Sequence, residues 1–197
     1  MSTNINKWAP GESYGPVLSQ TDLYLLKTDL EINPIFAQKF GGYHLVLDLT
    51  TGVARDADGR NSEFNAKTQP AVLPRVEQLY VISETSPWCT TVRNPAGVTM
   101  SDVCQTVWSE YTNNAITDAE MGELPQRLKD QIKGTAQRNQ QPAGYGMYTP
   151  GGVRCRRVDW LRDRHFFEGL RKDEAYAKRR LGFSAPNVFI MDLNSYY

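Results

Sequence analysis

The sequence predicts an α+β domain with a mainly antiparallel sheet of about six strands and two or three helices packed on one face. Short runs of β-branched and aromatic residues, bounded by Gly, Pro or Asn, recur along the chain and are typical of strands. Two segments repeat apolar residues at helical spacing behind a capping signal. The strand runs and helix runs are segregated, which favours α+β over alternating βαβ units.

The length and composition fit one domain. The chain has 197 residues, of which 40% are hydrophobic and 11% aromatic, enough to bury a core. Residues 1–31 hold many polar and turn-forming residues and one short apolar group, at 23–26. We expect residues 1–31 to form an arm, partly mobile or draped on the domain, and residues 32–197 to form a single α+β domain.

The strand signals follow in order along the chain. A long loop is expected over residues 50–69, which are rich in Gly, Asp and Asn. Two neighbouring strand segments are close enough in sequence to form a hairpin. Residues 140–152 contain repeated Gly and Pro and are expected to be a loop. The strands are predicted at 43–49, 76–83, 88–93, 153–161, 165–170 and 187–193.

The strongest helix signal begins at Thr99. Thr99 can cap the helix, and Asp102 stands three residues later, as in a capping box. One apolar stripe is then predicted by residues that recur at helical spacing, namely Val103, Val107, Trp108 and Tyr111.

Two further helices have weaker signals. Thr117 followed by Glu120 repeats the capping-box pattern, and Pro125 suits the first turn of a renewed helix. This helix is expected to fade over residues 134–139, where Gly134 interrupts it. Residues 172–181 predict a short charged helix.

Charge is distributed unevenly. The chain has 22 basic and 22 acidic residues. Residues 151–180 hold ten basic and five acidic residues, so this segment carries +5 and the remainder −5. Part of the segment, residues 153–170, is predicted to be an arginine-rich hairpin.

The arginine-rich hairpin has two interpretations. Arginine forks bind phosphate or carboxylate, and a neighbouring aromatic ring can stack on a base. Alternatively, the arginines pair with nearby acids or form a solvated face, and the balanced net charge disfavours a dedicated nucleic-acid binder. The candidate binding residues are Arg154, Arg156, Arg157, Trp160, Arg164 and His165.

Signals for catalysis, metal binding and cofactors are weak. The only histidines are His44 and His165, and no Gly-x-Ser-x-Gly or phosphate-binding glycine motif accompanies them. Cys89, Cys104 and Cys155 are odd in number and widely spaced, which favours small core residues over a disulfide framework or a zinc site. We expect no catalytic residues, no metal and no cofactor.

The N-terminal residues lack the apolar run of a signal peptide, and no stretch approaches the roughly 20 apolar residues of a membrane span. We therefore expect a cytoplasmic or nuclear protein that is not secreted by a classical signal and does not contact a membrane.

Several motifs, among them Asn33-Pro34, Leu47-Asp48-Leu49 and Pro87-Trp88, follow one another in a recognisable order. This order resembles that of a fungal family of domains whose function is unknown. The resemblance covers about residues 32–192; the N-terminal arm, the Gly/Pro loop before Gly151 and Cys89 depart from it. It implies a fold and brings no activity or catalytic residue. Its motifs, individually weak, agree in order and spacing. They are residues 33–34, 47–49, 79–82, 87–88, 91–92, 98–103, 152–154, 157–161 and 167–170.

Three functions remain open. The first is a non-enzymatic domain that binds an unknown protein partner or small ligand, with a homodimer as one arrangement. The second is anion or nucleic-acid binding through the arginine-rich hairpin, with nucleic acid the less favoured ligand. The third is a small-molecule enzyme using His165, Asp159 or a tyrosine, which requires a deep cavity beside that group. The first rests partly on aromatic residues expected in loops or tails, namely Trp8, Tyr145, Tyr148, Tyr196 and Tyr197.

Overall fold

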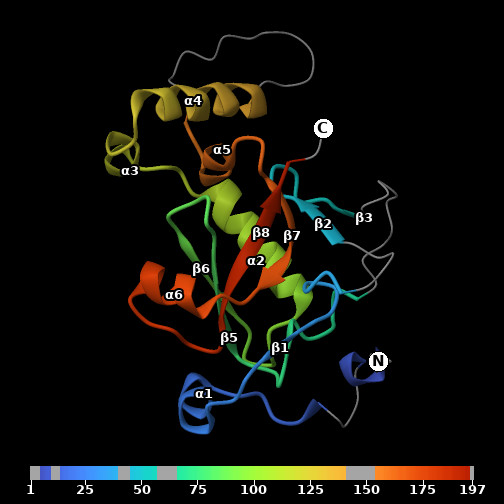
Figure 1. The fold of residues 1–197 in the computed structure, drawn as a ribbon. Helices are drawn as coiled ribbons and strands as arrows, with labels where there is room; N and C mark the ends of the chain where they lie inside the picture. The colour runs from blue at the N-terminus through green and yellow to red at the C-terminus, as the bar shows by residue number, and fades with distance from the viewer. Residues whose placement is uncertain (1–4, 10–13, 40–44, 57–65, 141–153, 196–197) are drawn as a thin grey trace.

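A mixed sheet of six strands forms the centre of the protein (Figure 1). The computed structural model describes residues 5–9, 14–39, 45–56, 66–140 and 154–195. Within these ranges a separate two-stranded sheet pairs β1 with β4. The strands are β1 (Glu31–Ile32), β2 (Leu45–Asp48), β3 (Ala54–Asp56), β4 (Val72–Leu73), β5 (Gln78–Ile82), β6 (Cys89–Arg93), β7 (Phe166–Arg171) and β8 (Val188–Asn194).

The order in the main sheet is β3-β2-β7-β8-β5-β6. Every neighbouring pair is antiparallel except β5 and β8, which run parallel. The predicted hairpin of β5 and β6 is confirmed, with Gln78 opposite Arg93 and Ile82 opposite Cys89. The mainly antiparallel α+β fold class is therefore confirmed.

The capping signals placed two helices correctly. The Thr99 side chain accepts the N–H of Asp102, and the Asp102 carboxylate accepts the N–H of Thr99, which completes a capping box. Thr117 and Glu120 form the same arrangement at the next helix. The helices are α1 (Gln20–Leu26), α2 (Met100–Asn113), α3 (Asp118–Gly122), α4 (Gln126–Gln140), α5 (Arg157–Leu161) and α6 (Glu174–Leu181), with a 3₁₀ turn over Ile5–Trp8.

Helices lie on both faces of the sheet, so the expectation of a single helical face is wrong. On β5 and β8 successive side chains point to opposite faces. Leu79 and Phe189 join the main core, to which α2 also belongs. Ile82 and Ile190 lie in a second cluster with Ala177 of α6. Since β5 and β8 are inner strands with apolar residues on both faces, each face requires a cover.

The predicted strand at 153–161, and with it the arginine-rich hairpin, is wrong. Residues 157–161 form the helix α5, and β7 pairs with β2 and β8. The Asp159 carboxylate accepts the backbone N–H of Arg156 at 2.7 Å and so caps the first turn of α5. Val158 and Leu161, three residues apart, are both buried, which is helical spacing. The alternation that resembled a strand is coincidental.

Two boundaries differ from the prediction. The loop expected over residues 50–69 contains β3, which pairs with β2. The helix α4 continues through Gly134 to Gln140 rather than fading. Almost all of the loop expected over residues 140–152 lies outside the described residues, as does the start of the predicted first strand, with His44.

The described part of residues 1–31 packs on the sheet domain. Ser19 and Asp22 form a capping box at the start of α1, a helix that was not predicted from the sequence. Leu18, Leu23 and Leu30 are buried in the main core. Trp8, expected on the surface, is also buried. Within the described residues, every helix is too short or too polar to traverse a lipid bilayer.

The cysteines differ in their surroundings. Cys104 lies in the core, and burial raises the pKa of its thiol to about 12. Cys155 is half-buried and Cys89 is exposed on the edge strand β6. The expectation of small core residues therefore holds for Cys104 and is wrong for Cys89.

Candidate functional site

Two of the candidate binding residues belong to a packed aromatic cluster. The Arg157 guanidinium donates to Glu110 Oε2 at 2.8 Å and lies 4.8 Å from the centre of the Trp88 ring. Trp160 meets Trp88 edge-on, with ring centroids 5.1 Å apart, and its Nε1 donates to the carbonyl of Thr85. These contacts join α5 to α2 and to the segment that leads into β6.

Trp88 is the centre of this aromatic cluster. It is buried, it meets Tyr111 of α2 edge-on, and its Nε1 donates to Glu120 Oε1 at 2.6 Å. Burial raises the pKa of the Glu120 carboxyl, but hydrogen bonds from Thr117 and Trp88 outweigh it and hold that pKa below its ordinary value. The contacts around Trp88 are those of a structural junction between β6, α2 and α3.

Replacing Glu120 with glutamine is expected to lower the free energy of unfolding in a pH-dependent way. Folding lowers the pKa of Glu120, so the ionised carboxylate stabilises the folded state. This stabilisation is complete above the pKa of the unfolded chain, about 4.3, and is lost as the pH falls through the lower pKa of the folded protein. Urea unfolding of both proteins from pH 7 to pH 3 measures the difference. Glu123→Gln, at the exposed end of α3, is the control and should show a much smaller difference.

The other candidate residues do not share one face. Arg154 and Arg164 are exposed before and after α5. The Arg156 Nε lies 4.0 Å from the buried carboxylate of Asp159. His165 lies against the Phe166 ring, and its Nδ1 is 2.9 Å from the Arg162 carbonyl. Anion binding by these residues stays a prediction, without the hairpin on which it was based.

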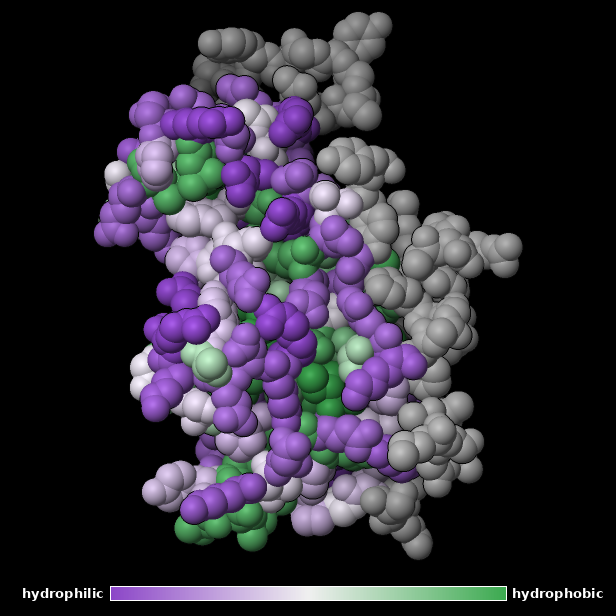
Figure 2. All heavy atoms as spheres, in the orientation of Figure 1, coloured by the Kyte–Doolittle hydropathy of each residue, from purple (hydrophilic) through white to green (hydrophobic). Residues whose placement is uncertain are grey.

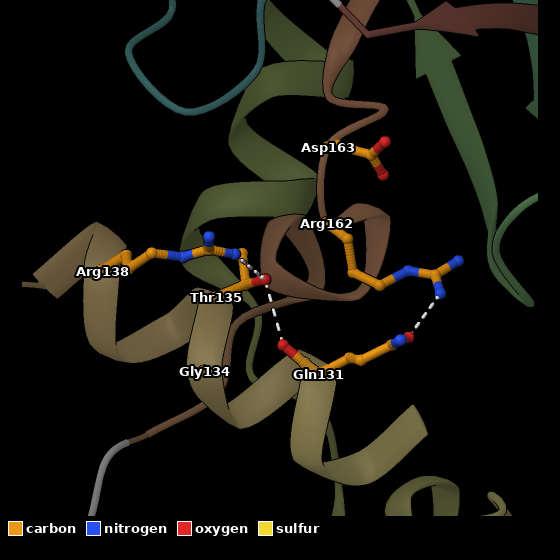
Figure 3. Close-up of a pocket in the computed structure, with 6 residues that line it drawn as sticks. All are labelled: Gln131, Gly134, Thr135, Arg138, Arg162 and Asp163. Atoms are coloured by element: carbon orange, nitrogen blue, oxygen red, sulfur yellow. Dashed lines mark hydrogen bonds between the residues drawn. The ribbon is translucent and has the colours of Figure 1, made fainter. Parts of the chain in front are cut away.

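A cavity of about 540 Å³ lies where α4 meets the turn after α5 (Figure 3). We call it the arginine cavity, because two arginine side chains from different elements line it. Neither Arg138 nor Arg162 was among the candidates, since only the packing of α4 on α5 brings them together. Its lining residues are Gln131, Gly134, Thr135, Arg138, Arg162 and Asp163.

A second cavity, also of about 540 Å³, lies between α1 and α6; we call it the α1–α6 groove. Leu23, Ala177 and Val188 are buried side chains on its floor, and charged side chains stand around them. Lys172 donates to Asp29 across the groove. Its lining residues are Leu23, Tyr24, Lys27, Thr28, Asp29, Lys172, Asp173, Glu174, Ala177, Ser184, Ala185, Pro186 and Val188.

An exposed apolar surface adjoins the α1–α6 groove. Tyr24, Leu25 and Leu26 are consecutive residues of α1 and are 82%, 68% and 62% exposed. Figure 2 shows this apolar surface at the lower end of the molecule, over α1. Phe183, next to the groove residue Ser184, is 49% exposed. The apolar group at 23–26 is visible in the sequence, but only the fold shows that just Leu23 turns inward.

Of the groups proposed for catalysis, a tyrosine, Tyr24, lines the α1–α6 groove, whereas His165 and Asp159 lie elsewhere. Neither His165 nor Asp159 lines either of these two cavities, and Asp159 is fully buried. Among the residues that the structure describes, no group of three or more His, Cys, Asp or Glu side chains is placed to hold a metal ion. Four of the five expected surface aromatics, Tyr145, Tyr148, Tyr196 and Tyr197, lie outside the described residues.

The fold and these surfaces define an α+β domain with a helix on each face of its sheet and cavities at two helix junctions. The chain matches the model of a family of unknown function, DUF6699, over residues 42–180, and it belongs to that family. The resemblance to a family of unknown function is thereby confirmed, and its fungal range stays a prediction. Searches of curated proteins and of solved structures found no match. The matched range includes α2 to α5 and precedes β8, and α1 lies before it.

Proposed function

We propose that the chain is a protein-binding domain whose α1–α6 groove holds an amphipathic helix of a partner. The observation that carries this proposal is the exposure of Tyr24, Leu25 and Leu26 beside the groove. Three consecutive large apolar residues in water contribute nothing to the stability of the free domain, and such a surface is typical of a binding site.

The groove suits an amphipathic helix. Its buried floor can accept apolar side chains, while α1 and α6 provide two walls, as in helix-in-groove recognition. The charges on the walls differ: Lys27 stands at the end of α1, and Asp173 and Glu174 stand at the start of α6. Lys172 and Asp29 pair with each other. Asp173 already pairs with Arg171 and caps α6. We therefore expect a partner helix that carries a basic side chain facing Glu174.

Replacing Leu25 and Leu26 together with serine is expected to abolish or strongly weaken partner binding. Truncating two exposed anchors removes the apolar contact and should lower affinity at least about tenfold. The measurement is a quantitative pull-down from the native cell, followed by titration of a recovered helical segment against both proteins. The fold should persist, because both leucines are mostly exposed.

The matched control is Val53→Ser. Val53 is 42% exposed just before β3 and lines neither cavity, so its replacement should leave the recovered proteins unchanged. Equal recovery by wild type and the double variant would reject the exposed apolar surface of α1 as part of the binding site. Sedimentation velocity provides a second test, which measures the oligomeric state of the wild type and the double variant. A wild-type dimer that dissociates in the double variant would assign the surface to a second copy of the chain and contradict a heterologous partner.

A further inference from the structure

The arginine cavity presents two guanidinium groups that no carboxylate neutralises among the described residues. Arg157 and Arg171 pair with acidic side chains, whereas Arg138 and Arg162 form no such pair there. The Asp163 carboxylate lines the same cavity but lies apart from both guanidinium groups (Figure 3). The lining therefore carries two positive charges and one negative charge, and this net positive charge favours an anionic ligand.

Most of the donors of these arginines make no hydrogen bond within the described residues. Arg138 donates to Thr135 Oγ1 at 3.1 Å, and Arg162 donates through one terminal nitrogen to Gln131 Oε1 at 2.9 Å. The Nε of Arg162 is buried without a hydrogen-bond partner within the described residues. A guanidinium has five N–H donors, so the terminal nitrogens of both side chains retain donors for a ligand.

Gly134 points to the same cavity independently. It lies inside α4, where glycine weakens a helix relative to alanine. A Cβ at Gly134 would meet no heavy atom within 4 Å, and its backbone is not in the left-handed region. Neither packing nor backbone conformation therefore requires glycine. Its one structural consequence is to leave the α4 side of the cavity open.

Arg162 has an unfavourable backbone conformation. Its φ is 58° and its ψ −113°, a combination that glycine adopts far more readily than a residue with a side chain. Backbone strain of this kind clusters at binding sites. A role for the guanidinium explains why arginine stands here.

We propose that the arginine cavity binds the phosphate group of a small phosphomonoester. Such a group carries about −1.5 to −2 charges at pH 7, and its oxygens fit the fork of a guanidinium. The cavity of about 540 Å³ is of small-molecule size and has room for an organic group beside the phosphate. This site is separate from the α1–α6 groove and does not depend on partner binding.

The test is a titration of the full-length ¹⁵N-labelled chain with phenyl phosphate and, separately, with inorganic phosphate at constant ionic strength. We expect saturable shifts of the amide signals of residues 131–138 and 162–163, with phenyl phosphate binding more tightly than the free ion. Arg138→Gln removes a charged donor, and Gly134→Gln fills the cavity. Each should weaken binding at least about tenfold.

Two controls are matched to these variants. Arg127→Gln removes the same charge from an exposed position on α4 outside the cavity, and Gly122→Gln adds the same side chain where a Cβ also meets nothing. Both should bind as wild type does. If Arg127→Gln weakened the binding of phenyl phosphate as much as Arg138→Gln does, the loss would reflect general electrostatic attraction. That result would overturn the proposed site.

Three other outcomes would also overturn the proposal. One is an absence of saturable shifts at these amides. Another is succinate binding as tightly as phenyl phosphate, which would reject the phosphate class. The third is wild-type affinity in folded Gly134→Gln. Glutamine favours a helix more than glycine does, so Gly134→Gln should fold. It can therefore test the proposal even if Arg138→Gln fails to fold.

Discussion

Gly169→Ala is expected to destabilise the protein by about 3 kcal/mol or more. Gly169 lies in β7, where the pairing with β8 shifts register between Phe167 and Gly169. A Cβ there would lie 2.2 Å from the carbonyl oxygen of Phe36, far inside van der Waals contact. The same oxygen accepts the N–H of Leu170 at 2.8 Å, so the two backbones cannot separate without breaking a buried hydrogen bond.

The surroundings of Gly169 have little freedom to adjust. Phe36 is fully buried and meets Phe167 edge-on, with ring centroids 5.7 Å apart. Moving the Phe36 backbone would therefore disturb the main core as well as the hydrogen bond. Equilibrium unfolding in urea measures the loss of free energy.

Gly134→Ala is the control for this prediction. Because an added Cβ at Gly134 meets nothing, we expect it to raise the free energy of unfolding by about 0.5–1 kcal/mol. The two substitutions make the same chemical change in opposite surroundings. A Gly169→Ala protein as stable as wild type would show that the approach of Phe36 to β7 is looser than the structure has it.

Asp159→Ala is expected to destabilise the protein by about 3 kcal/mol. Asp159 is fully buried, and its carboxylate accepts the backbone N–H of Arg156 and the side-chain amide of Asn139, each at 2.7 Å. Alanine would leave both donors without this acceptor. Since Asn139 belongs to α4, the substitution also removes a contact that holds α4 against α5.

The control for Asp159 is Asp163→Ala. Asp163 is an exposed carboxylate of the same segment, and its loss should change stability by less than about 0.5 kcal/mol. Thermal or urea unfolding of both variants measures the difference. Equal effects would contradict the prediction. They would mean that the hydrogen bonds of Asp159 to Arg156 and Asn139 stabilise the fold no more than an exposed carboxylate does.

Parts of the fold could be read from local patterns. Thr99 with Asp102, and Thr117 with Glu120, place two helix starts because each capping bond joins residues three apart. The hairpin of β5 and β6 follows from two strand signals separated by a short turn. Such features depend on a few neighbouring residues, so the rest of the chain changes them little.

The segment at 153–161 shows where local patterns fail. Its residues alternate as in a strand, yet they form α5, because Val158 and Leu161 together face the core and Asp159 binds Arg156 and Asn139. Strand and helix patterns both fit so short a run, and packing decides between them. The candidate binding residues inherited this error, because their shared face existed only in the strand.

The sequence by itself determined the α+β class, the capped starts of α2 and α3, most of the strands and the uneven charge. These depend on propensity, alternation and hydrogen bonds between close neighbours. Only the tertiary structure decided that α6 covers the second face of the sheet, that Leu25 and Leu26 face outward, and that Arg138 and Arg162 line one cavity. Each of these arises from contacts between distant segments, whose free energy depends on how whole elements pack.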